Sequence, residues 1–378
     1  MRVALILVAI FPSLVQAQLH GRGRPVSRTR SSSASVGEQV ITRYAKPLKV
    51  GKEVVDDGTA FRIYRVAQVK GDWLWLESGR VSGWVEAGNV VPYSQAVEHF
   101  TQQIAVPHKA ASAYACRGIV RHANGEYDAA IADYDAALRL DPKLALAYYN
   151  RGLAWQKKQH HDKAIADYGE ALRLDPKYAL AYRTRGSAWH AKQDYDRALA
   201  DYDAALRLDP KHALTYHNRG LAWCAKQDFD KALADCSEAI RLDPQSAVAY
   251  RTRGLAWQKK QHHDQAIADY DEAIRLAPDD PIAHNNLAWL FATCRDETRR
   301  DGKRAAESAT RACELSGWCD WRFLHTLAAA CAETGDFDNA VKHGELALSM
   351  APAEHRQRSE EVLEAYKAGK PHREQAVD

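Results

Sequence analysis

The chain has 378 residues, enough for two or three domains, and its composition narrows the class of protein. The formal net charge of +3 is small for this length, so the overall charge does not indicate a nucleic-acid-binding protein. Ten tryptophans and seventeen tyrosines, many of them at recurring positions, indicate an ordered core and argue against a disordered chain.

Residues 1–17 have the pattern of a secretory signal peptide. One positive charge at Arg2 precedes an apolar stretch that ends at Val15, and the expected cleavage point follows Ala17. An uncleaved anchor is the alternative, but the stretch is shorter than the roughly 20 residues that span a bilayer, and it contains Pro12. No later segment is apolar enough to cross a membrane. We therefore expect an exported protein, located in the periplasm, in the cell envelope or outside the cell.

Between residues 18 and 93 the sequence changes from a linker to a small β domain. Residues 18–37 contain Gly, Ser, Pro and four Arg with almost no apolar side chains, which predicts a flexible tether. Contact of these arginines with anionic envelope polymers is an alternative to a solvated tether. Residues 38–93 contain short alternating apolar segments separated by glycine-containing turns, which predicts about five strands in a small barrel or open sheet.

The last predicted strands of the β domain carry Trp73 and the run Gly83-Trp84-Val85. These residues resemble the closing strands of bacterial SH3-like domains, and the resemblance implies a small SH3-like β-barrel. In exported proteins such domains often bind cell-wall peptides or other proteins. The simpler alternative, which we prefer, is that Trp73, Trp75 and Trp84 fill the core of the domain.

The stretch from Ala111 to Asp280 is a tandem repeat with a period of 34 residues. The run DYDAALRLDPK at 133–143 returns, with few changes, in each of the four repeats that follow. A period of this size predicts stacked supersecondary units. The five repeats span residues 111–144, 145–178, 179–212, 213–246 and 247–280.

Each repeat is predicted to be a pair of amphipathic helices. Numbered from its first residue, every repeat has Tyr at position 4, Gly at position 8, Ala at positions 20 and 27, and Pro at position 32. The small residues permit close helix crossing, the aromatic side chains fill the space beside them, and proline ends the second helix. These residues match the tetratricopeptide (TPR) repeat at the same spacing. The chain thus resembles TPR proteins, which implies a mainly α superhelical solenoid that binds proteins or peptides.

One charged position departs from the TPR pattern in all five repeats, and a second charge recurs with it. Position 7 is Arg where the family commonly has Leu, and position 23 is Asp. We hypothesise that the two side chains pair within each repeat and form a ladder along the solenoid, the alternative being two independently solvated charges. The residues are Arg117, Arg151, Arg185, Arg219 and Arg253 with Asp133, Asp167, Asp201, Asp235 and Asp269.

The repeat pattern continues more weakly on both sides of the five regular copies, and a polar-faced helix is expected to cap the array for solubility. We expect a capping helix in residues 94–108, a sixth repeat with an insertion of about five residues in 281–320, a seventh repeat in 321–352, a second capping helix in 353–368 and a frayed tail in 369–378.

Seven cysteines leave at least one unpaired within a monomer. Four of them fall between residues 294 and 331, where a local disulfide staple is plausible in an exported protein. The alternative is that each is a small buried apolar side chain. The positions are Cys116, Cys224, Cys236, Cys294, Cys313, Cys319 and Cys331.

No catalytic motif stands out, so we expect no enzyme, no cofactor and no metal. The chain lacks Gly-x-Ser-x-Gly, HExxH and a phosphate-binding glycine loop. Paired carboxylates recur on the second helix of each repeat, and such recurrence is typical of a solvated face. The pairs His160-His161 and His262-His263 occupy turns, but a metal site there would need a third ligand, and duplication of the repeat explains them more simply.

The resemblance to TPR proteins implies a binding groove lined by positions 2, 5, 6, 9, 12 and 13 of the first helices. Several TPR proteins hold a peptide carboxylate with Lys, Asn and Arg at such positions, which suits an acidic or extended peptide. The alternative is a hydrated face without a single ligand. The candidate groove residues are Tyr149, Asn150, Lys157, Arg183, His217, Asn218, Arg251, Lys259 and Asn286.

Taken together, these features predict an exported, non-enzymatic scaffold that binds a protein or peptide partner in a TPR groove. The alternative is a cell-envelope organising protein whose SH3-like module binds peptidoglycan or a surface polymer. An enzyme is the third class, and no nucleophile, base and oxyanion site support it.

Overall fold

The structure, a computed structural model, describes residues 34–42, 48–50, 53–56, 63–78 and 81–373. The predicted signal peptide and most of the predicted linker lie outside these residues. The chain divides into an N-terminal unit, Met1–Leu208, and a C-terminal unit, Asp209–Asp378, and each is described by itself. The described residues form sixteen α-helices preceded by a small antiparallel sheet, which confirms the predicted mainly α fold class.

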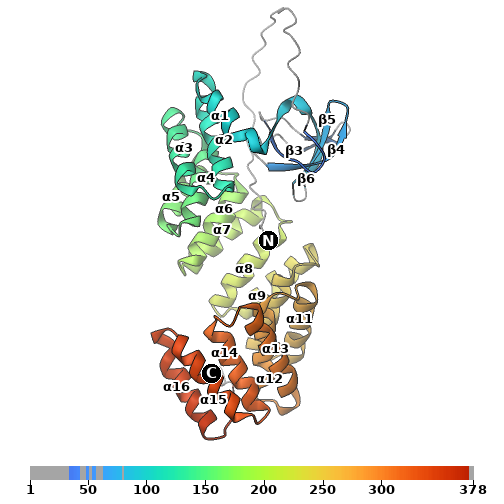
Figure 1. The fold of residues 1–378 in the computed structure, drawn as a ribbon, viewed down its shortest axis with the longest axis vertical. Helices are drawn as coiled ribbons and strands as arrows, with labels where there is room; N and C mark the ends of the chain where they lie inside the picture. The colour runs from blue at the N-terminus through green and yellow to red at the C-terminus, as the bar shows by residue number, and fades with distance from the viewer. Residues whose placement is uncertain (1–33, 43–47, 51–52, 57–62, 79–80, 374–378) are drawn as a thin grey trace, which may run out of the picture. The chain divides into compact units, whose positions relative to one another are not determined.

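The N-terminal unit begins with seven strands in one antiparallel sheet (Figure 1). The strand order is β3-β2-β6-β5-β4-β1-β7, and the register shifts between Val66 and Gln68, where β4 pairs with β5. The strands are β1 (Gln39–Thr42), β2 (Leu48–Val50), β3 (Glu53–Asp56), β4 (Ile63–Lys70), β5 (Trp73–Ser78), β6 (Val81–Glu86) and β7 (Val90–Pro92).

The tryptophans of the sheet lie outside its core, so the prediction that they fill it is wrong. Strand β5 alternates, and Leu74 and Leu76 take the inward positions, where they pack in the core of the sheet. Trp73 is therefore 45% exposed. Trp75 pairs with Trp84 of β6, and their half-buried rings meet edge to face with centroids 5.4 Å apart. The resemblance to SH3-like domains stays a prediction.

A short helix, α1 (Ala96–Ile104), joins the sheet to the helical hairpins of the N-terminal unit. Its Phe100 is buried in an apolar cluster that also contains Ile41 of β1 and Val91 of β7. The first helix of the next hairpin contributes Cys116 and Val120 to the same cluster. The helix α1 thus packs between the sheet and the first hairpin, and the capping role of residues 94–108 stays a prediction.

The other helices form antiparallel hairpins, one for each repeat, as Figure 1 shows. No helix among the described residues is long and apolar enough to cross a membrane. In the N-terminal unit the hairpins are α2 (Ala110–Ala123) with α3 (Tyr127–Leu140), α4 (Ala145–Lys157) with α5 (His161–Leu174), and α6 (Ala179–Ala191) with α7 (Tyr195–Leu208).

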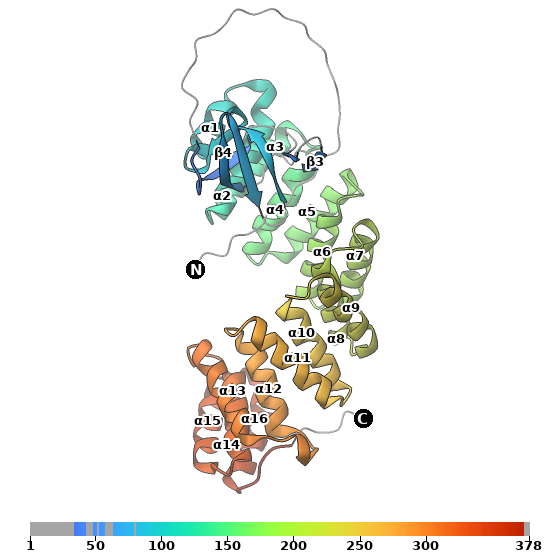
Figure 2. The same cartoon turned by 90° about the vertical axis from the view of Figure 1, so that its right-hand side faces the viewer.

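The C-terminal unit continues with four hairpins and a last helix, and Figure 2 shows its final hairpins beside one another. The sixth repeat carries its insertion between α12 and α13, as expected. The elements are α8 (Ala213–Ala225) with α9 (Phe229–Leu242), α10 (Ala247–Lys259) with α11 (His263–Leu276), α12 (Pro281–Thr293) with α13 (Gly302–Leu315), α14 (Trp321–Glu333) with α15 (Phe337–Met350), and α16 (Ala353–Lys367).

Glycine at position 8 sets the distance between the two helices of a hairpin. A Cβ atom added to Gly152 would lie 2.6 Å from Cε1 of Tyr168, which is closer than atoms pack. Tyr168 is fully buried and occupies the space that a side chain on the first helix would need. The repeated Gly and Tyr are therefore two halves of one packing contact.

The turn between the two helices requires a left-handed residue. Gly125 occupies this position in the first repeat with φ +85°, and Gly335 does so in the seventh with φ +82°. Glutamine replaces glycine in the middle repeats, and Gln193, for example, has φ +61°. A residue with a Cβ is strained in this region, so these turns carry a small conformational cost.

The predicted tail differs from the structure in its described part. Gly369, with φ +68°, ends α16, and the Lys370 N–H donates to the Ala365 carbonyl. Beyond it, Arg373 forms an ion pair with Glu333 of α14, with Nη2 and Oε2 2.7 Å apart. Residues 370–373, hereafter the C-terminal strap, are thus packed rather than frayed, whereas residues 374–378 lie outside the described residues.

None of the seven cysteines, all of which lie among the described residues, forms a disulfide, so the local staple considered from the sequence is not formed. Cys294 and Cys313 are buried, in keeping with the alternative that these residues act as small apolar side chains. Cys319 is exposed, and its Sγ donates to the Ser316 carbonyl.

Candidate functional site

The arginine at position 7 and the aspartate at position 23 pair in all five regular repeats, which confirms the predicted Arg–Asp ladder. In each repeat the arginine Nε and Nη2 donate to the two carboxylate oxygens over 2.6–2.9 Å. The guanidinium also lies over the tyrosine ring at position 4, with Cζ of Arg185 5.7 Å from the centroid of Tyr182. The hydrogen bonds to Asp201 raise the pKa of Arg185.

The ladder is part of the interior and does not supply ligand-binding groups. Each aspartate of the ladder is buried, and Asp201 is 5% exposed. A carboxylate whose two oxygens accept a guanidinium fork is satisfied, because the pair meets both the charge and the hydrogen bonds of the buried group. The charged residues at positions 7 and 23 therefore stabilise the hairpins. A ligand would have to be bound by other positions of the first helices.

In the N-terminal unit, two candidate groove residues are buried, which corrects the expectation that they face a ligand. Tyr149 is 3% exposed, packs its ring on Tyr168 and Tyr178, and shares a hydrogen bond with Thr184 over 3.3 Å. Asn150 is 2% exposed, and its Nδ2 donates to the Leu146 carbonyl one turn earlier. Tyr149 therefore helps to hold neighbouring repeats together, whereas the Asn150 hydrogen bond lies within α4.

The two basic candidates of the N-terminal unit remain accessible. Lys157 is exposed at the end of α4, and Arg183 is half-buried on α6. Burial is the main reason why the pKa of the neighbouring His122 is lowered, and the positive charge of Lys157 lowers it further. These side chains keep the positive character expected of the face.

In the C-terminal unit, His217 is also buried, and this corrects its assignment to the groove floor. It is 8% exposed, and its Nε2 lies 3.1 Å from Oγ1 of Thr252 in the next repeat. Burial lowers its pKa to about 4, while a hydrogen bond with Asn218 partly opposes the shift. Arg251 forms an ion pair with Asp280 over 2.6 Å, so its charge is already compensated.

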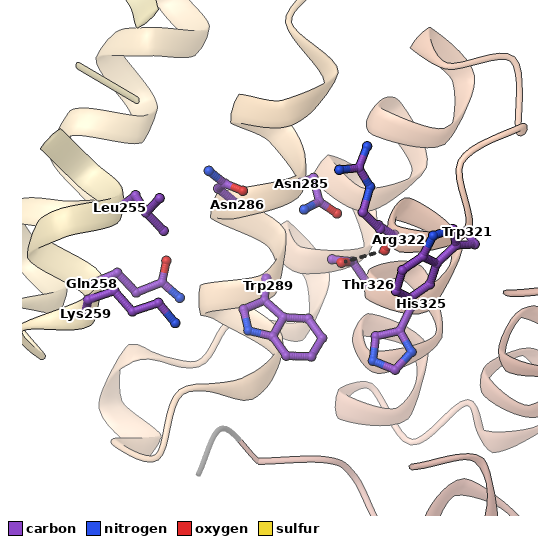
Figure 3. Close-up of a pocket in the computed structure, with 10 residues that line it drawn as sticks. All are labelled: Leu255, Gln258, Lys259, Asn285, Asn286, Trp289, Trp321, Arg322, His325 and Thr326. Atoms are coloured by element: carbon purple, nitrogen blue, oxygen red, sulfur yellow. Dashed lines mark hydrogen bonds between the residues drawn. The ribbon is translucent and has the colours of Figure 1, made fainter. Parts of the chain in front are cut away.

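Lys259 and Asn286, the two remaining candidates, line a pocket of about 250 Å³. The pocket lies on the face formed by the first helices α10, α12 and α14, hereafter the first-helix face (Figure 3). Gln258 and Lys259 extend from α10 toward the indole of Trp289. The lining residues are Leu255, Gln258, Lys259, Asn285, Asn286, Trp289, Trp321, Arg322, His325 and Thr326.

Sequence reasoning missed the aromatic and C-terminal part of this lining. Trp289 occupies position 9 of the sixth repeat, and Arg322 and His325 occupy positions 2 and 5 of the seventh. These are the positions that define the expected groove in the regular repeats. The signal was therefore present, but it lay in the degenerate repeats, where the match to the pattern is weakest.

The chemistry of the pocket is cationic, amide-rich and aromatic. Lys259 and Arg322 are its charged side chains, and no carboxylate is among the lining residues. Arg322 donates through Nε to Asp320 over 2.9 Å and through Nη2 to the same carboxylate, so its Nη1 hydrogens remain to donate elsewhere. Gln258 accepts from the Tyr270 hydroxyl, which leaves its amide nitrogen as the donor.

An aromatic stack forms one wall. The ring of His325 lies nearly parallel to the indole of Trp289, with centroids 5.5 Å apart and an interplanar angle of 24°. Burial lowers the pKa of His325 to about 4, and the neighbouring His372 and Arg358 act in the same direction. The imidazole is thus neutral at pH 7. Among the described residues no three His, Cys, Asp or Glu side chains lie close enough together to hold a metal ion.

Comparison with known proteins supports the assignment of the repeats. Family models described as TPR repeat and tetratricopeptide repeat match residues 118–159, 145–178, 191–247 and 223–285. No curated protein matches the chain. The matched segments overlap the regular repeats and stop near the start of the sixth.

Two solved structures with a TM-score of 0.50 or above show the same fold. A tetratricopeptide repeat protein from Parabacteroides merdae is 17% identical, with 72% of this chain and 99% of that chain covered and a TM-score of 0.50. The anaphase-promoting complex assembly Cut9–Hcn1 is 17% identical over 63% of this chain and 46% of that chain, with a TM-score of 0.53. YrrB, described as a TPR protein with an unusual peptide-binding site, is 25% identical over 50% of this chain and 96% of that chain, with a TM-score of 0.44.

Three observations agree. The period of 34 residues, the glycine–tyrosine packing within each hairpin and the family models all identify the same structural unit. The chain is a tetratricopeptide repeat protein.

Proposed function

We propose that the chain is a non-enzymatic interaction scaffold that binds an acidic, extended peptide segment on the first-helix face of α10, α12 and α14. The observation that carries the proposal is the pocket lining, which contains the cationic side chains of Lys259 and Arg322 and no carboxylate, while Asp320, outside the lining, accepts two hydrogen bonds from Arg322. A TPR fold supports protein or peptide partners in general, and the charge of this pocket favours an acidic one.

Each part of the pocket has a separate role. The ammonium group of Lys259 provides a flexible point charge, whereas the Nη1 hydrogens of Arg322 offer directed hydrogen bonds to a carboxylate. The Asn286 amide suits the backbone of an extended ligand. Trp289 and Trp321 supply flat apolar surface that an aliphatic or proline side chain next to the acidic residue would cover.

Binding of fluorescein-labelled peptides to the full chain tests the proposal. The panel contains extended peptides with two or three acidic residues, the same peptides with lysine in place of each acid, and shuffled sequences. We expect the acidic peptides to bind and Lys259→Glu to weaken them at least tenfold, since the substitution places a like charge against the ligand.

Lys303→Glu is the matched control, because it makes the same charge change at an exposed residue of α13, a second helix. Equal binding of the acidic and basic peptides would refute the proposal. So would equal losses from Lys259→Glu and Lys303→Glu.

A second candidate function rests on the outer face of the β-sheet. Trp73 is 45% exposed, and Trp75 and Trp84 meet edge to face beside it. We propose that, in an exported protein, this face binds peptidoglycan or another envelope polymer through stacking on the rings. Sedimentation of the full chain with purified cell wall tests this, with Trp73→Ala expected to reduce the bound fraction. If the unmodified chain does not sediment with the cell wall, this second proposal is wrong.

A further inference from the structure

The C-terminal strap crosses the same helices that form the pocket. After α16 ends, residues 370–373 run past the end of α14 and reach α12. Arg373 donates through Nη1 to the Ala292 carbonyl of α12 over 3.4 Å. Its Nη2 pairs with Glu333 of α14 over 2.7 Å. A single arginine side chain thus contacts two successive first helices.

Glu333 is held in place to receive this arginine. Its side chain is 13% exposed, and its Oε1 accepts from Nε of Arg300 over 2.9 Å. Arg300 also donates to the Cys294 carbonyl in the insertion of the sixth repeat. Because Arg300 fixes one carboxylate oxygen, the other is directed at the position that Arg373 occupies.

The strap also contacts the aromatic wall of the pocket. The His372 ring lies 5.7 Å from the indole of Trp289, and His325 stacks on the same indole. Trp289 lines the pocket, so the strap and the proposed peptide site share a side chain. The strap is therefore continuous with the binding face.

The strap contributes little to the core of the C-terminal unit. None of its residues belongs to the apolar cluster that joins α12, α14 and α16. The Arg373 side chain remains 32% exposed. A segment held by one partly exposed ion pair, one hydrogen bond to the Ala292 carbonyl and one ring contact can be exchanged without unfolding the hairpins beneath it.

We propose that the C-terminal strap is an intramolecular ligand, and that Glu333, the Ala292 carbonyl and Trp289 form a subsite for an arginine-bearing extended segment of the partner. The partner's arginine replaces Arg373 and its acidic residue enters the pocket of Lys259 and Arg322. This inference rests on the proposed function and deepens it, because it names a partner with both an acidic and a basic residue.

Tethering explains why so few contacts keep the strap in place. A short linker gives a segment an effective concentration in the millimolar range, so a weak site is occupied when the segment belongs to the same chain. A partner that also fills the acidic pocket gains contacts that the strap residues lack, and it displaces the strap by mass action.

The test is titration of the full chain with the peptide acetyl-Gly-Lys-Pro-His-Arg-Gly-amide, followed by NMR line shifts. We expect Arg373→Ala, which vacates the subsite, to bind the peptide at least tenfold more tightly than the unmodified chain. Lys370→Ala, a change at an exposed strap residue, is the matched control and should behave like the unmodified chain. A peptide with Ala in place of Arg should not bind.

Adding Glu333→Gln to Arg373→Ala should abolish peptide binding, and a circular dichroism spectrum checks that the double variant is folded. Equal affinity for Arg373→Ala and the unmodified chain would overturn the inference. Absence of binding to Arg373→Ala up to about 10 mM, above the effective concentration of a short tether, would also overturn it.

The outcomes for the two proposals are separable. If acidic peptides fail to bind while the strap peptide binds Arg373→Ala, the subsite stands and the proposed acidic pocket is wrong. If acidic peptides bind in a manner that depends on Lys259 while the strap peptide does not bind, the pocket stands and the strap is only a structural clasp.

Discussion

The guanidinium of Arg185 and the carboxylate of Asp201 form a two-point hydrogen bond across one hairpin, with Nε and Nη2 donating over 2.8 and 2.7 Å. Asp201 is 5% exposed, whereas the Arg185 side chain is 25% exposed. Both oxygens of this aspartate accept hydrogen bonds from the arginine, and the same pair recurs in every regular repeat, although in the first repeat Asp133 also accepts from Nη1 of Arg121 over 2.9 Å.

Replacing either partner should destabilise the hairpin by about 3 kcal/mol, since each change leaves a poorly solvated charge without its partner. The double variant Arg185→Ala/Asp201→Ala should lose less than the sum of the two single variants. We expect a coupling energy of about 1 to 3 kcal/mol from urea unfolding. The exposed pair Arg241 and Glu238 is the control and should show no measurable coupling. A coupling near zero for Arg185 and Asp201 would reduce the ladder to two independent charges.

Replacing the glycine at position 8 by alanine should destabilise the chain, unless a second substitution shortens the side chain that faces the new Cβ. In Gly186→Ala the new atom meets Cε1 of Tyr202 at 2.8 Å, and in Gly220→Ala it meets Sγ of Cys236 at 2.8 Å. Both variants should lose about 1 to 3 kcal/mol. Adding Cys236→Ala should restore part of the loss in Gly220→Ala, because the clashing sulfur is removed. Thermal unfolding of the three proteins checks this, and a double variant less stable than Gly220→Ala would contradict the packing described.

The left-handed backbone at Gln193 predicts how glycine, glutamine and valine at this position rank in stability. Gln193 has φ +61°, so Gln193→Gly should stabilise the chain by a few tenths of a kcal/mol to about 1 kcal/mol. Gln193→Val should destabilise it, since a β-branched residue is strained further at positive φ. Urea midpoints of the three proteins give the ranking. The strain assignment fails if valine is as stable as glycine.

Stability should fall as the pH drops below neutrality. Burial, followed by the positive charge of Lys157, lowers the pKa of His122 to about 4. Between its unfolded pKa of about 6.5 and the folded value, the unfolded chain binds more protons, so stability is full above about pH 6.5 and declines toward pH 4. The loss is about 3 kcal/mol at most for this residue. His122→Leu should flatten the pH dependence of unfolding, whereas substitution of the exposed His108 should leave it unchanged.

The sequence was most informative where the repeat is regular. The period predicted each helix pair, and the recurrence of Arg117 with Asp133 in every copy suggested a pair before any distance was known. A residue that recurs in all five repeats is constrained by the hairpin, so its partner lies at the same distance along the sequence in each repeat. Glycine at position 8 and tyrosine at position 24 follow the same logic, since small and large residues face each other.

Three features could not be derived from the sequence. The run Trp73-Leu74-Trp75-Leu76 is apolar on both faces, so its alternation does not say which set is inward. Tyr149 occupies a groove position, but its ring is long enough to reach the neighbouring Tyr178. The strap has no periodicity, and its contacts with Glu333 come from residues far apart in the chain.

Photo-crosslinking of a bound acidic peptide tests the central claim most directly. The tightest acidic peptide of the panel, with a benzophenone residue beside its acid, is irradiated with the full chain, and crosslinked residues are located by mass spectrometry. The proposed site predicts crosslinks on α12 and α14, at or beside Trp289 and Trp321, that are lost in Lys259→Glu. Crosslinks confined to the β-sheet or to second helices, or unchanged in Lys259→Glu, would contradict it.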